Sequence, residues 1–165
     1  MDQANSSTST EMPSGGVYLW FLNTLVRVRV SCDQGSDALS VIEHRAVYGD
    51  SPPLHSHSTE DEFFHVLEGQ VRFQLDGVDY HAGPGAMFLA PKNSIHSYRV
   101  ESPEGGRFVT ITKGGDFERF VLAFSRPAER DELPPQAGPP PPEAFQALSE
   151  IAATYGITFH GPPLH

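Results

Sequence analysis

The feature that most constrains the fold of this chain is a spaced set of three histidines and a glutamate. His55 and His57 are two residues apart, and Glu62 follows after four intervening residues. Side chains two apart on a β-strand point to the same face, so the histidine pair can hold one ion between its rings. Residues 58–61 have a turn-forming composition, so the chain can reverse there and place Glu62 at the start of a second strand.

A third histidine further along the chain would complete a metal site. His96 would add its imidazole to the other two histidines and the carboxylate. Such a mixed nitrogen and oxygen set suits a divalent transition metal and leaves coordination positions free for a substrate or dioxygen. We therefore expect one divalent ion held by His55, His57, Glu62 and His96. The ligand set does not choose among iron, manganese, nickel, cobalt, copper and zinc.

The spacing of these residues resembles the first sequence motif of the cupin family. That motif reads Gly, five residues, His-x-His, three or four residues, Glu, six residues, Gly. This chain satisfies every position with Gly49, His55, His57, Glu62 and Gly69. Five fixed residue types recur by chance in roughly one window in a million, so the match is specific.

The second cupin motif is matched in part. It reads Gly, five residues, Pro-x-Gly, two residues, His, three residues, Asn. Gly85, Pro91 and His96 fit it, whereas Asn93 replaces the second Gly and Val100 replaces the Asn. Asparagine tolerates the left-handed backbone conformation almost alone among residues other than glycine, so Asn93 can keep the turn.

Short strands separated by glycine and proline indicate an all-β sandwich or small barrel. The Asp76-Gly77 pair is a strong hairpin signal between two of them. The predicted strands include residues 17–21, 25–31, 38–48, 62–67, 71–75, 78–81, 86–90, 95–100 and 107–113. The cupin resemblance narrows this class to a double-stranded β-helix, or jelly-roll barrel, with a short helix after the barrel and a C-terminal helix.

Four segments are expected along the chain. Residues 1–16 are polar and aperiodic and predict a disordered N-terminal tail. Residues 17–126 form the cupin barrel and a closing helix, for which Asp116 is the expected N-cap. Residues 127–142 are a Pro-rich linker, and residues 143–165 form a C-terminal helix and a tail that dock on the barrel.

The strand faces that carry the ligands also predict an apolar pocket. Glu62, Phe64 and Val66 alternate onto one face of a strand. We expect the substrate pocket to contain Phe64, Phe73, Met87, Leu89 and Tyr98. The Tyr98 hydroxyl is a candidate polar contact for a substrate. Alternatively these side chains fill the barrel, since about eight strands enclose just enough space to be filled or to hold one small ligand.

The composition limits the partners and the compartment. The 11 basic and 21 acidic residues give a formal net charge of −10, which argues against binding to nucleic acid or to an anionic membrane. No apolar run approaches a membrane span, and the polar start lacks a signal-peptide core. The single cysteine, Cys32, fits a reducing compartment. We therefore expect a cytoplasmic protein.

Nearly the whole chain after residue 16 resembles bacterial single-cupin proteins grouped with quercetin 2,3-dioxygenases. The resemblance rests on the metal motif, the Phe63-Phe64 pair, the segment 114–120, the Pro-rich linker and the ending 155–163. It implies a metal-dependent dioxygenase acting on a flavonol or another enol-containing aromatic small molecule, with Glu62 as the catalytic proton acceptor. Two alternatives stay open: a metal-dependent cyclase or isomerase that uses no dioxygen, and a non-catalytic small-molecule-binding cupin.

The strand face turned away from the metal site predicts a homodimer. Phe63 and Leu67 are apolar and fall on that outer face. An uncovered apolar sheet face of this kind usually meets a partner. The C-terminal helix is the competing cover for the same surface.

Overall fold

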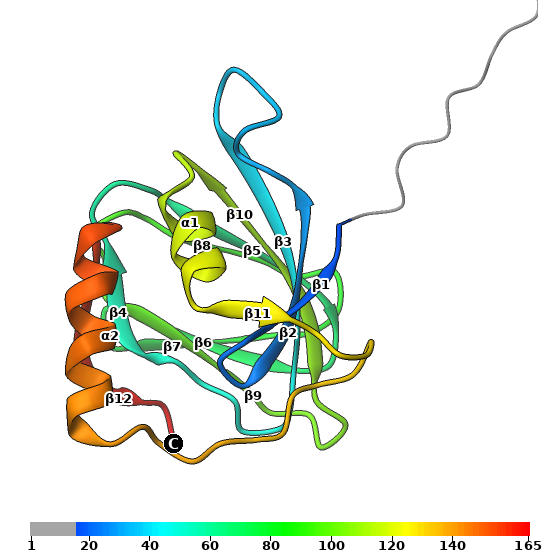
Figure 1. The fold of residues 1–165 in the computed structure, drawn as a ribbon. Coiled ribbons are helices and arrows are strands. Elements are labelled where there is room, and N and C mark those ends of the chain that lie inside the picture. Colours follow the sequence, from blue (N-terminus) through cyan, green and yellow to red (C-terminus); the bar gives the residue numbers. More distant parts are fainter. Residues whose placement is uncertain (1–15) are drawn as a thin grey trace, which may run out of the picture.

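Strands in two facing antiparallel sheets build a barrel in a computed structural model that describes residues 16–165 (Figure 1). The first sheet has the order β11-β1-β2-β3-β10-β5-β8, and the second has the order β12-β4-β9-β6-β7. The strands are β1 (Tyr18–Phe21), β2 (Thr24–Val30), β3 (Leu39–Ala46), β4 (Pro53–His57), β5 (Glu62–Glu68), β6 (Val71–Leu75), β7 (Val78–Ala82), β8 (Met87–Ala90), β9 (His96–Val100), β10 (Gly106–Lys113), β11 (Ser125–Pro127) and β12 (Ile157–Pro163). The predicted all-β barrel is confirmed. The expected disordered tail lies outside the described residues, except for Gly16.

Alternating burial explains how the first sheet faces the barrel interior. In β3, β5 and β10 every second side chain is buried, which is the pattern of strands with one inner face. Ile42 lies opposite Thr110, which in turn lies opposite Phe64. In the next row Thr112 lies opposite Glu62. The pairing register therefore aims Glu62 into the interior.

Two turns have the backbone that their residues predict. Asp76 and Gly77 have φ values of 49° and 83° and join β6 to β7 as the expected hairpin. Asn93 has a φ of 67° in the turn before β9. The left-handed conformation is therefore kept at the position where the cupin motif has glycine, and His96 enters β9 directly after this turn.

The core consists of two hydrophobic clusters inside the barrel. The first contains Val26, Ile42, Phe117, Phe120, Val121, Ala152 and Ile157, from the first sheet, α1 (Asp116–Ala123), α2 (Pro142–Thr154) and β12. The second contains Phe64, Val66, Val71, Phe73, Ala82, Ala90 and Phe108. Because α1 contributes Phe117, Phe120 and Val121 to the first cluster, it covers this part of the core.

Helix α1 begins where expected, but the predicted N-cap is wrong. Gly115, not Asp116, is the N-cap residue, and its φ of 88° suits glycine. The helix has no side-chain cap of its own; the carboxylate of Glu60, distant in the sequence, accepts hydrogen bonds from its first backbone N–H groups. Local sequence rules see only neighbouring residues, so they could not identify this cap.

The C-terminal segment is more ordered than the expected tail. After α2 the chain forms β12, which pairs with β4 so that Ile157 lies opposite His57 and Phe159 lies opposite His55. Helix α2 packs against this strand and buries Ala152. The end of the chain is therefore an edge strand beside the two histidines, and the sequence analysis missed it.

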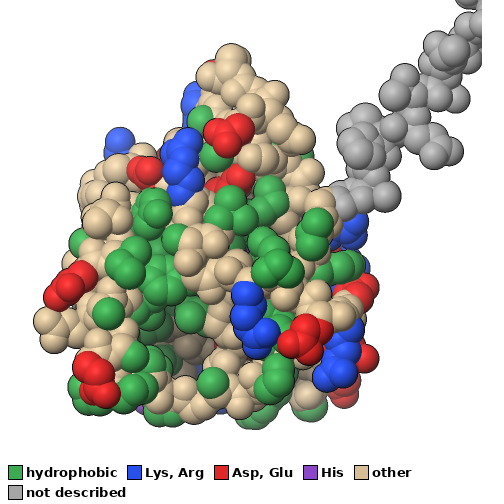
Figure 2. All heavy atoms as spheres, in the orientation of Figure 1, with side chains coloured by type: hydrophobic (Ala, Val, Ile, Leu, Met, Phe, Trp, Pro, Cys, Tyr) green, Lys and Arg blue, Asp and Glu red, His purple; other side chains and the backbone are tan. Residues whose placement is uncertain are grey.

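The Pro-rich segment contacts the outer side of the first sheet. The indole N–H of Trp20 donates to the carbonyl of Glu132 at 2.7 Å, and Arg45 donates to Asp131 at 3.0 Å. Figure 2 shows the face that carries α1 and α2, where hydrophobic side chains gather with charged side chains between and around them. Within residues 16–165, neither helix has the length and apolar character needed to cross a membrane.

Candidate metal centre

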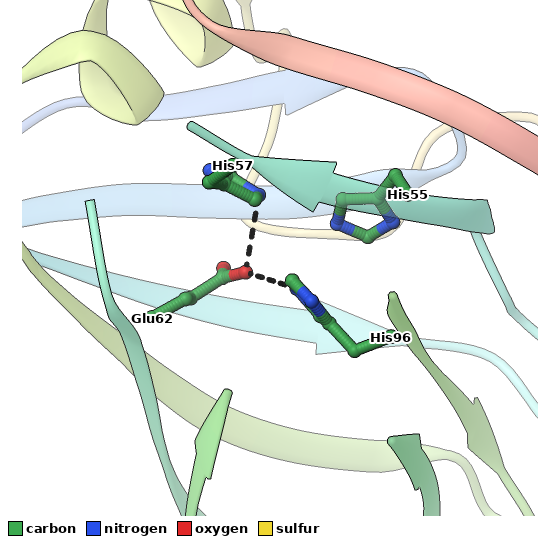
Figure 3. A group of neighbouring side chains, drawn as sticks. All are labelled: His55, His57, Glu62 and His96. Atoms are coloured by element: carbon green, nitrogen blue, oxygen red, sulfur yellow. Dashed lines mark hydrogen bonds and ion pairs between the residues drawn. The ribbon is translucent and has the colours of Figure 1, made fainter. Parts of the chain in front are cut away.

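The three histidines and the glutamate come together from three strands of both sheets. His55 and His57 lie on β4, Glu62 begins β5, and His96 begins β9 directly opposite His55. One ligand atom from each residue can be chosen so that all four lie within 4.8 Å of one another. Figure 3 shows the side chains pointing toward a common centre. Two ligands of one ion with bonds of about 2.1 Å can be about 4.2 Å apart, so small shifts would suffice to close the site.

The centre is buried and surrounded by aromatic rings. The exposed fractions are 1% for His57, 2% for Glu62 and His96, and 8% for His55. Each histidine has an edge contact with one phenylalanine. The ring centroids are 5.5 Å apart for His57 and Phe117, 6.4 Å for His55 and Phe159, and 6.5 Å for His96 and Phe64. These rings come from α1, β12 and β5 and keep water away from the polar cluster.

Backbone carbonyls fix the proton position on two of the rings. The carbonyl of Pro53 lies 2.8 Å from Nδ1 of His55, and that of Ser94 lies 3.1 Å from Nδ1 of His96. A carbonyl can only accept, so each Nδ1 carries a proton and each Nε2 presents a lone pair. Hydrogen bonds of this kind from the second ring nitrogen orient metal-binding histidines in known sites.

Burial and mutual contact favour the protonation states that metal ligands need. Burial lowers the pKa of His55 to about 3, with the neighbouring His96 and His57 adding to the effect. Burial also lowers the pKa of His57. Burial alone would raise the pKa of Glu62, but the adjacent His57 and His96 outweigh it and bring this pKa to about 2. At neutral pH the imidazoles of His55 and His57 are therefore neutral and the carboxylate of Glu62 is ionised, which are the states that metal ligands need.

Unpartnered atoms show that the cluster fits a cation. Neither ring nitrogen of His57 has a hydrogen bond, although Nε2 lies 3.4 Å from Oε2 of Glu62. Nε2 of His96 lies 3.1 Å from the same oxygen. When the His96 ring carries a proton only on Nδ1, this contact joins two acceptors. A shared cation would satisfy all of these lone pairs, so the donor set fits a divalent transition metal.

The predicted pocket residues divide into two groups, and two of them are wrong. Phe64 and Phe73 are buried, with ring centroids 5.0 Å apart. Met87 and Leu89 instead have exposed fractions of 62% and 47%. The register pairs Phe64 with Phe88, so Phe88 faces inward and stacks on Phe73 at 4.6 Å. When every residue of a strand is apolar, the sequence does not show which of its side chains face the interior.

Tyr98 points inward, but its hydroxyl already has a partner. It donates to Oδ2 of Asp50 at 2.9 Å, and burial raises the pKa of Tyr98 well above its usual value. The Tyr98 ring packs against Phe108 with centroids 4.9 Å apart. The rings of Tyr98 and Phe108 pack with those of Phe64, Phe73 and Phe88. Together they fill the part of the barrel interior next to His96.

Four residues near the centre were missed by the sequence analysis. Phe117 and Phe159 contact the ligand histidines, and Glu60 joins the ligand loop to α1. His44 is buried on β3, stacks on Phe108 and shares a hydrogen bond of 3.0 Å with Thr110. Burial alternates along β3 and places His44 inside, although the sequence of this strand shows no matching alternation of apolar and polar residues. The other three depend on contacts between distant segments.

A surface hollow lies next to the least buried ligand. Its volume is about 340 Å³, and it is lined by Pro53, Phe145, Phe159, His160, Gly161, Pro162 and Pro163. Phe159 forms part of this hollow and also contacts the His55 ring. The Phe159 side chain therefore stands between the hollow and the metal centre.

The comparisons with known proteins point in the same direction as the geometry. The sequence profile of the family described as Cupin domain matches residues 44–112, which include all four candidate ligands. Quercetin 2,3-dioxygenase from Bacillus subtilis (strain 168) is 33% identical over 99 residues, or 59% of this chain. The matched region covers 29% of that relative's length.

Solved structures share the fold at low sequence identity. An RmlC-like cupin from Shewanella frigidimarina NCIMB 400 superposes with a TM-score of 0.52 at 17% identity, covering 76% of this chain and 96% of that one. KdgF from Halomonas sp. gives a TM-score of 0.50 at 19% identity, covering 55% and 78%. At these identities the similarity concerns the fold alone.

Proposed function

The chain belongs to the cupin superfamily, and from that premise we propose that it is a metal-dependent dioxygenase of the quercetinase type. Its substrate would be a flavonol or another enol-containing aromatic small molecule, with dioxygen as the second reactant. The observation that carries the proposal is the buried cluster of His55, His57, Glu62 and His96, all of whose chosen ligand atoms lie within 4.8 Å of one another. The similarity to a quercetin 2,3-dioxygenase supports the choice of reaction.

The chain would hold the ion through three imidazoles and one carboxylate. A divalent iron, manganese, nickel, cobalt, copper or zinc ion bound there would act as a Lewis acid with an open coordination position. His55 and His96 offer Nε2, because their Nδ1 atoms donate to backbone carbonyls. The carboxylate of Glu62 completes the set.

Glu62 is the proposed general base. Its carboxylate is ionised at neutral pH, because the neighbouring histidines bring its pKa to about 2 against the effect of burial. It could therefore accept the proton of an enol hydroxyl placed beside it. No other carboxylate is among the candidate ligands in the described part of the chain.

The surroundings of the centre suit an apolar, planar substrate. Phe117, Phe159 and Phe64 contact the ligand rings and exclude water, which strengthens the electrostatic interactions inside the site. A substrate would approach through the hollow beside His55, where aromatic and proline side chains form most of the lining. Displacement of the Phe159 ring would connect this hollow to the ion.

We propose that two copies of this chain form a homodimer through the outer face of the first sheet. Val41, Ile111, Phe63 and Leu89 lie opposite one another on β3, β10, β5 and β8. They form an apolar stripe across four strands, and Leu89 is 47% exposed. Helix α2, the competing cover, packs on β12 of the other sheet instead. A second copy of this chain is the occupant that would bury the stripe.

Oxygen consumption tests the proposed reaction. The purified chain, loaded in turn with each candidate metal, is mixed with quercetin and other flavonols in an oxygen electrode. We expect oxygen uptake that depends on both the metal and the flavonol. Conversion of a substrate without oxygen uptake would identify a cyclase or isomerase instead, and binding without conversion would identify a binding protein.

A further inference from the structure

The ligand loop between His57 and Glu62 is tied to helix α1 by a single buried side chain. We propose that Glu60 is a positioning residue of the metal centre: it uses the N-terminus of α1 as a fixed anchor for the loop that carries two of the four ligands. The proposal extends the metal site described above and rests on it. It assigns to α1 a role in setting metal affinity.

Glu60 caps the helix with both carboxylate oxygens. Oε1 accepts from the backbone N–H of Gly115 at 2.6 Å and of Asp116 at 3.2 Å. Oε2 accepts from the N–H of Phe117 at 2.7 Å. Glu60 is only 2% exposed, so water cannot replace these bonds. An acidic group at a helix N-terminus also interacts favourably with the helix dipole.

The rest of the ligand loop is held on its other sides. The N–H of Ser58 donates to the carbonyl of Gly156 at 2.8 Å, and the carbonyl of His57 accepts from Asn93 at 2.7 Å. Oδ1 of Asp61 accepts from the N–H of Lys92 at 2.8 Å, in the turn that leads to His96. Glu60 therefore supplies the one tie from this loop to α1, among the hydrogen bonds of the described residues.

The same helix contacts a ligand ring directly. Phe117 follows the cap by two residues, and its ring meets the edge of His57 with centroids 5.5 Å apart. The Phe117 N–H is itself bound by Glu60. His57 has no hydrogen bond on either ring nitrogen, so packing against Phe117 contributes to the orientation of its ring. Loss of the cap would release the loop and this ring together.

Glu118 provides a matched control on the same helix. It is also 2% exposed, and its carboxylate accepts from the Ser31 hydroxyl at 2.7 Å and the Cys32 N–H at 2.9 Å. These partners lie in the turn after β2, and none of them belongs to the ligand loop. Replacing either carboxylate by an amide disturbs a buried, hydrogen-bonded site around α1. Only the change at Glu60 reaches the metal ligands.

The test compares Glu60→Gln with Glu118→Gln and the wild type, with Co²⁺ alone as the probe. Affinity is measured by competition with a chromophoric chelator, and thermal unfolding is followed on the metal-free proteins. Glutamine keeps one acceptor oxygen and turns an amide N–H₂ toward a backbone donor, so the cap is broken on one side. We expect Glu60→Gln to weaken Co²⁺ binding about 10-fold or more, the range for groups that orient ligands. Glu118→Gln should stay within about twofold of the wild type, since it orients no ligand.

Two results would overturn the positioning role. One is wild-type Co²⁺ affinity in Glu60→Gln, and the other is an equal loss in both variants, which would reflect general destabilisation. If Glu60→Gln does not fold, Glu60→Asp, which keeps the charge but is one methylene shorter, is measured against the same criterion. A wild-type protein that binds no Co²⁺ would instead refute the metal centre itself, and with it the proposed function.

Discussion

Nε2 of His96 lies 3.1 Å from Oε2 of Glu62, at the point where the two sheets of the barrel face each other. Nδ1 of His96 donates to the carbonyl of Ser94, so in the neutral ring this contact joins a lone pair to a carboxylate. His96 and Glu62 would together hold a divalent cation, which would remove the repulsion between the lone pair and the carboxylate.

Removal of one histidine ligand should therefore remove most of the metal without unfolding the barrel. We expect His57→Ala to lose most of its metal, while the two hydrophobic clusters still hold the fold. In the wild type, metal at about 100-fold above its Kd should add about 2.7 kcal/mol to the free energy of unfolding. Elemental analysis and thermal unfolding with and without metal check both expectations.

His65→Ala is the matched control for this change. His65 lies on β5 but on the face opposite to Glu62 and is not among the candidate ligands. It should keep wild-type metal content. Equal metal in the wild type, His57→Ala and His96→Ala would refute the ligand assignment.

The buried His44 should make the metal-free protein less stable in mild acid. Burial lowers the pKa of His44 from 6.5 to about 4 in the folded protein, partly offset by the charge of Glu62. Between these values the unfolded chain binds a proton that the folded chain does not, so stability falls as the pH falls. From about pH 7.5 to about pH 5, His44 should account for a loss of about 2 kcal/mol.

Urea unfolding of the wild type and His44→Gln at both pH values measures this contribution. The other histidines are present in both proteins, so their effects cancel in the comparison. The variant should lose about 2 kcal/mol less than the wild type over this interval. An identical loss in both proteins would mean that His44 titrates normally in the folded state.

The proposed dimer depends on the apolar stripe of the first sheet. Leu89→Glu places a charge in the apolar stripe, where desolvation is unfavourable, and should give a monomer. Leu122→Glu is the control, because Leu122 is 45% exposed on α1 and lies outside the stripe. Light scattering at micromolar concentration reads out the mass. A monomeric wild type would rule out this interface.

Local rules predicted the short strands and the shared face of His55 and His57, whereas the jelly-roll barrel was predicted from the resemblance to cupins. Parity along a strand places His55 and His57 together, and the left-handed turn at Asn93 leads into His96. The rule that alternate side chains of a strand share one face also predicted the inner face of β5. The same rule failed for Met87 and Leu89, because the four residues of β8 are all apolar and show no alternation of apolar and polar side chains.

What the sequence could not predict depends on contacts between distant segments. Glu60 caps a helix that begins more than 50 residues later, and nothing near Asp116 indicates this. The strand β12 was missed because its Gly- and Pro-containing sequence reads as irregular, yet it pairs as an edge strand with β4, where proline is tolerated. In both cases the local structure depends on a contact with a segment that is distant in the sequence.

The most direct test of the proposed function is the rate of Glu62→Gln per bound metal ion. Glutamine keeps one coordinating oxygen but cannot accept the substrate proton. Metal content should fall only in part, since three imidazoles remain. Oxygen consumption with quercetin, normalised to bound metal, should fall by about 10²–10⁴, the range for loss of a general base. An unchanged rate per metal ion in Glu62→Gln would contradict the role of Glu62 as the proton acceptor.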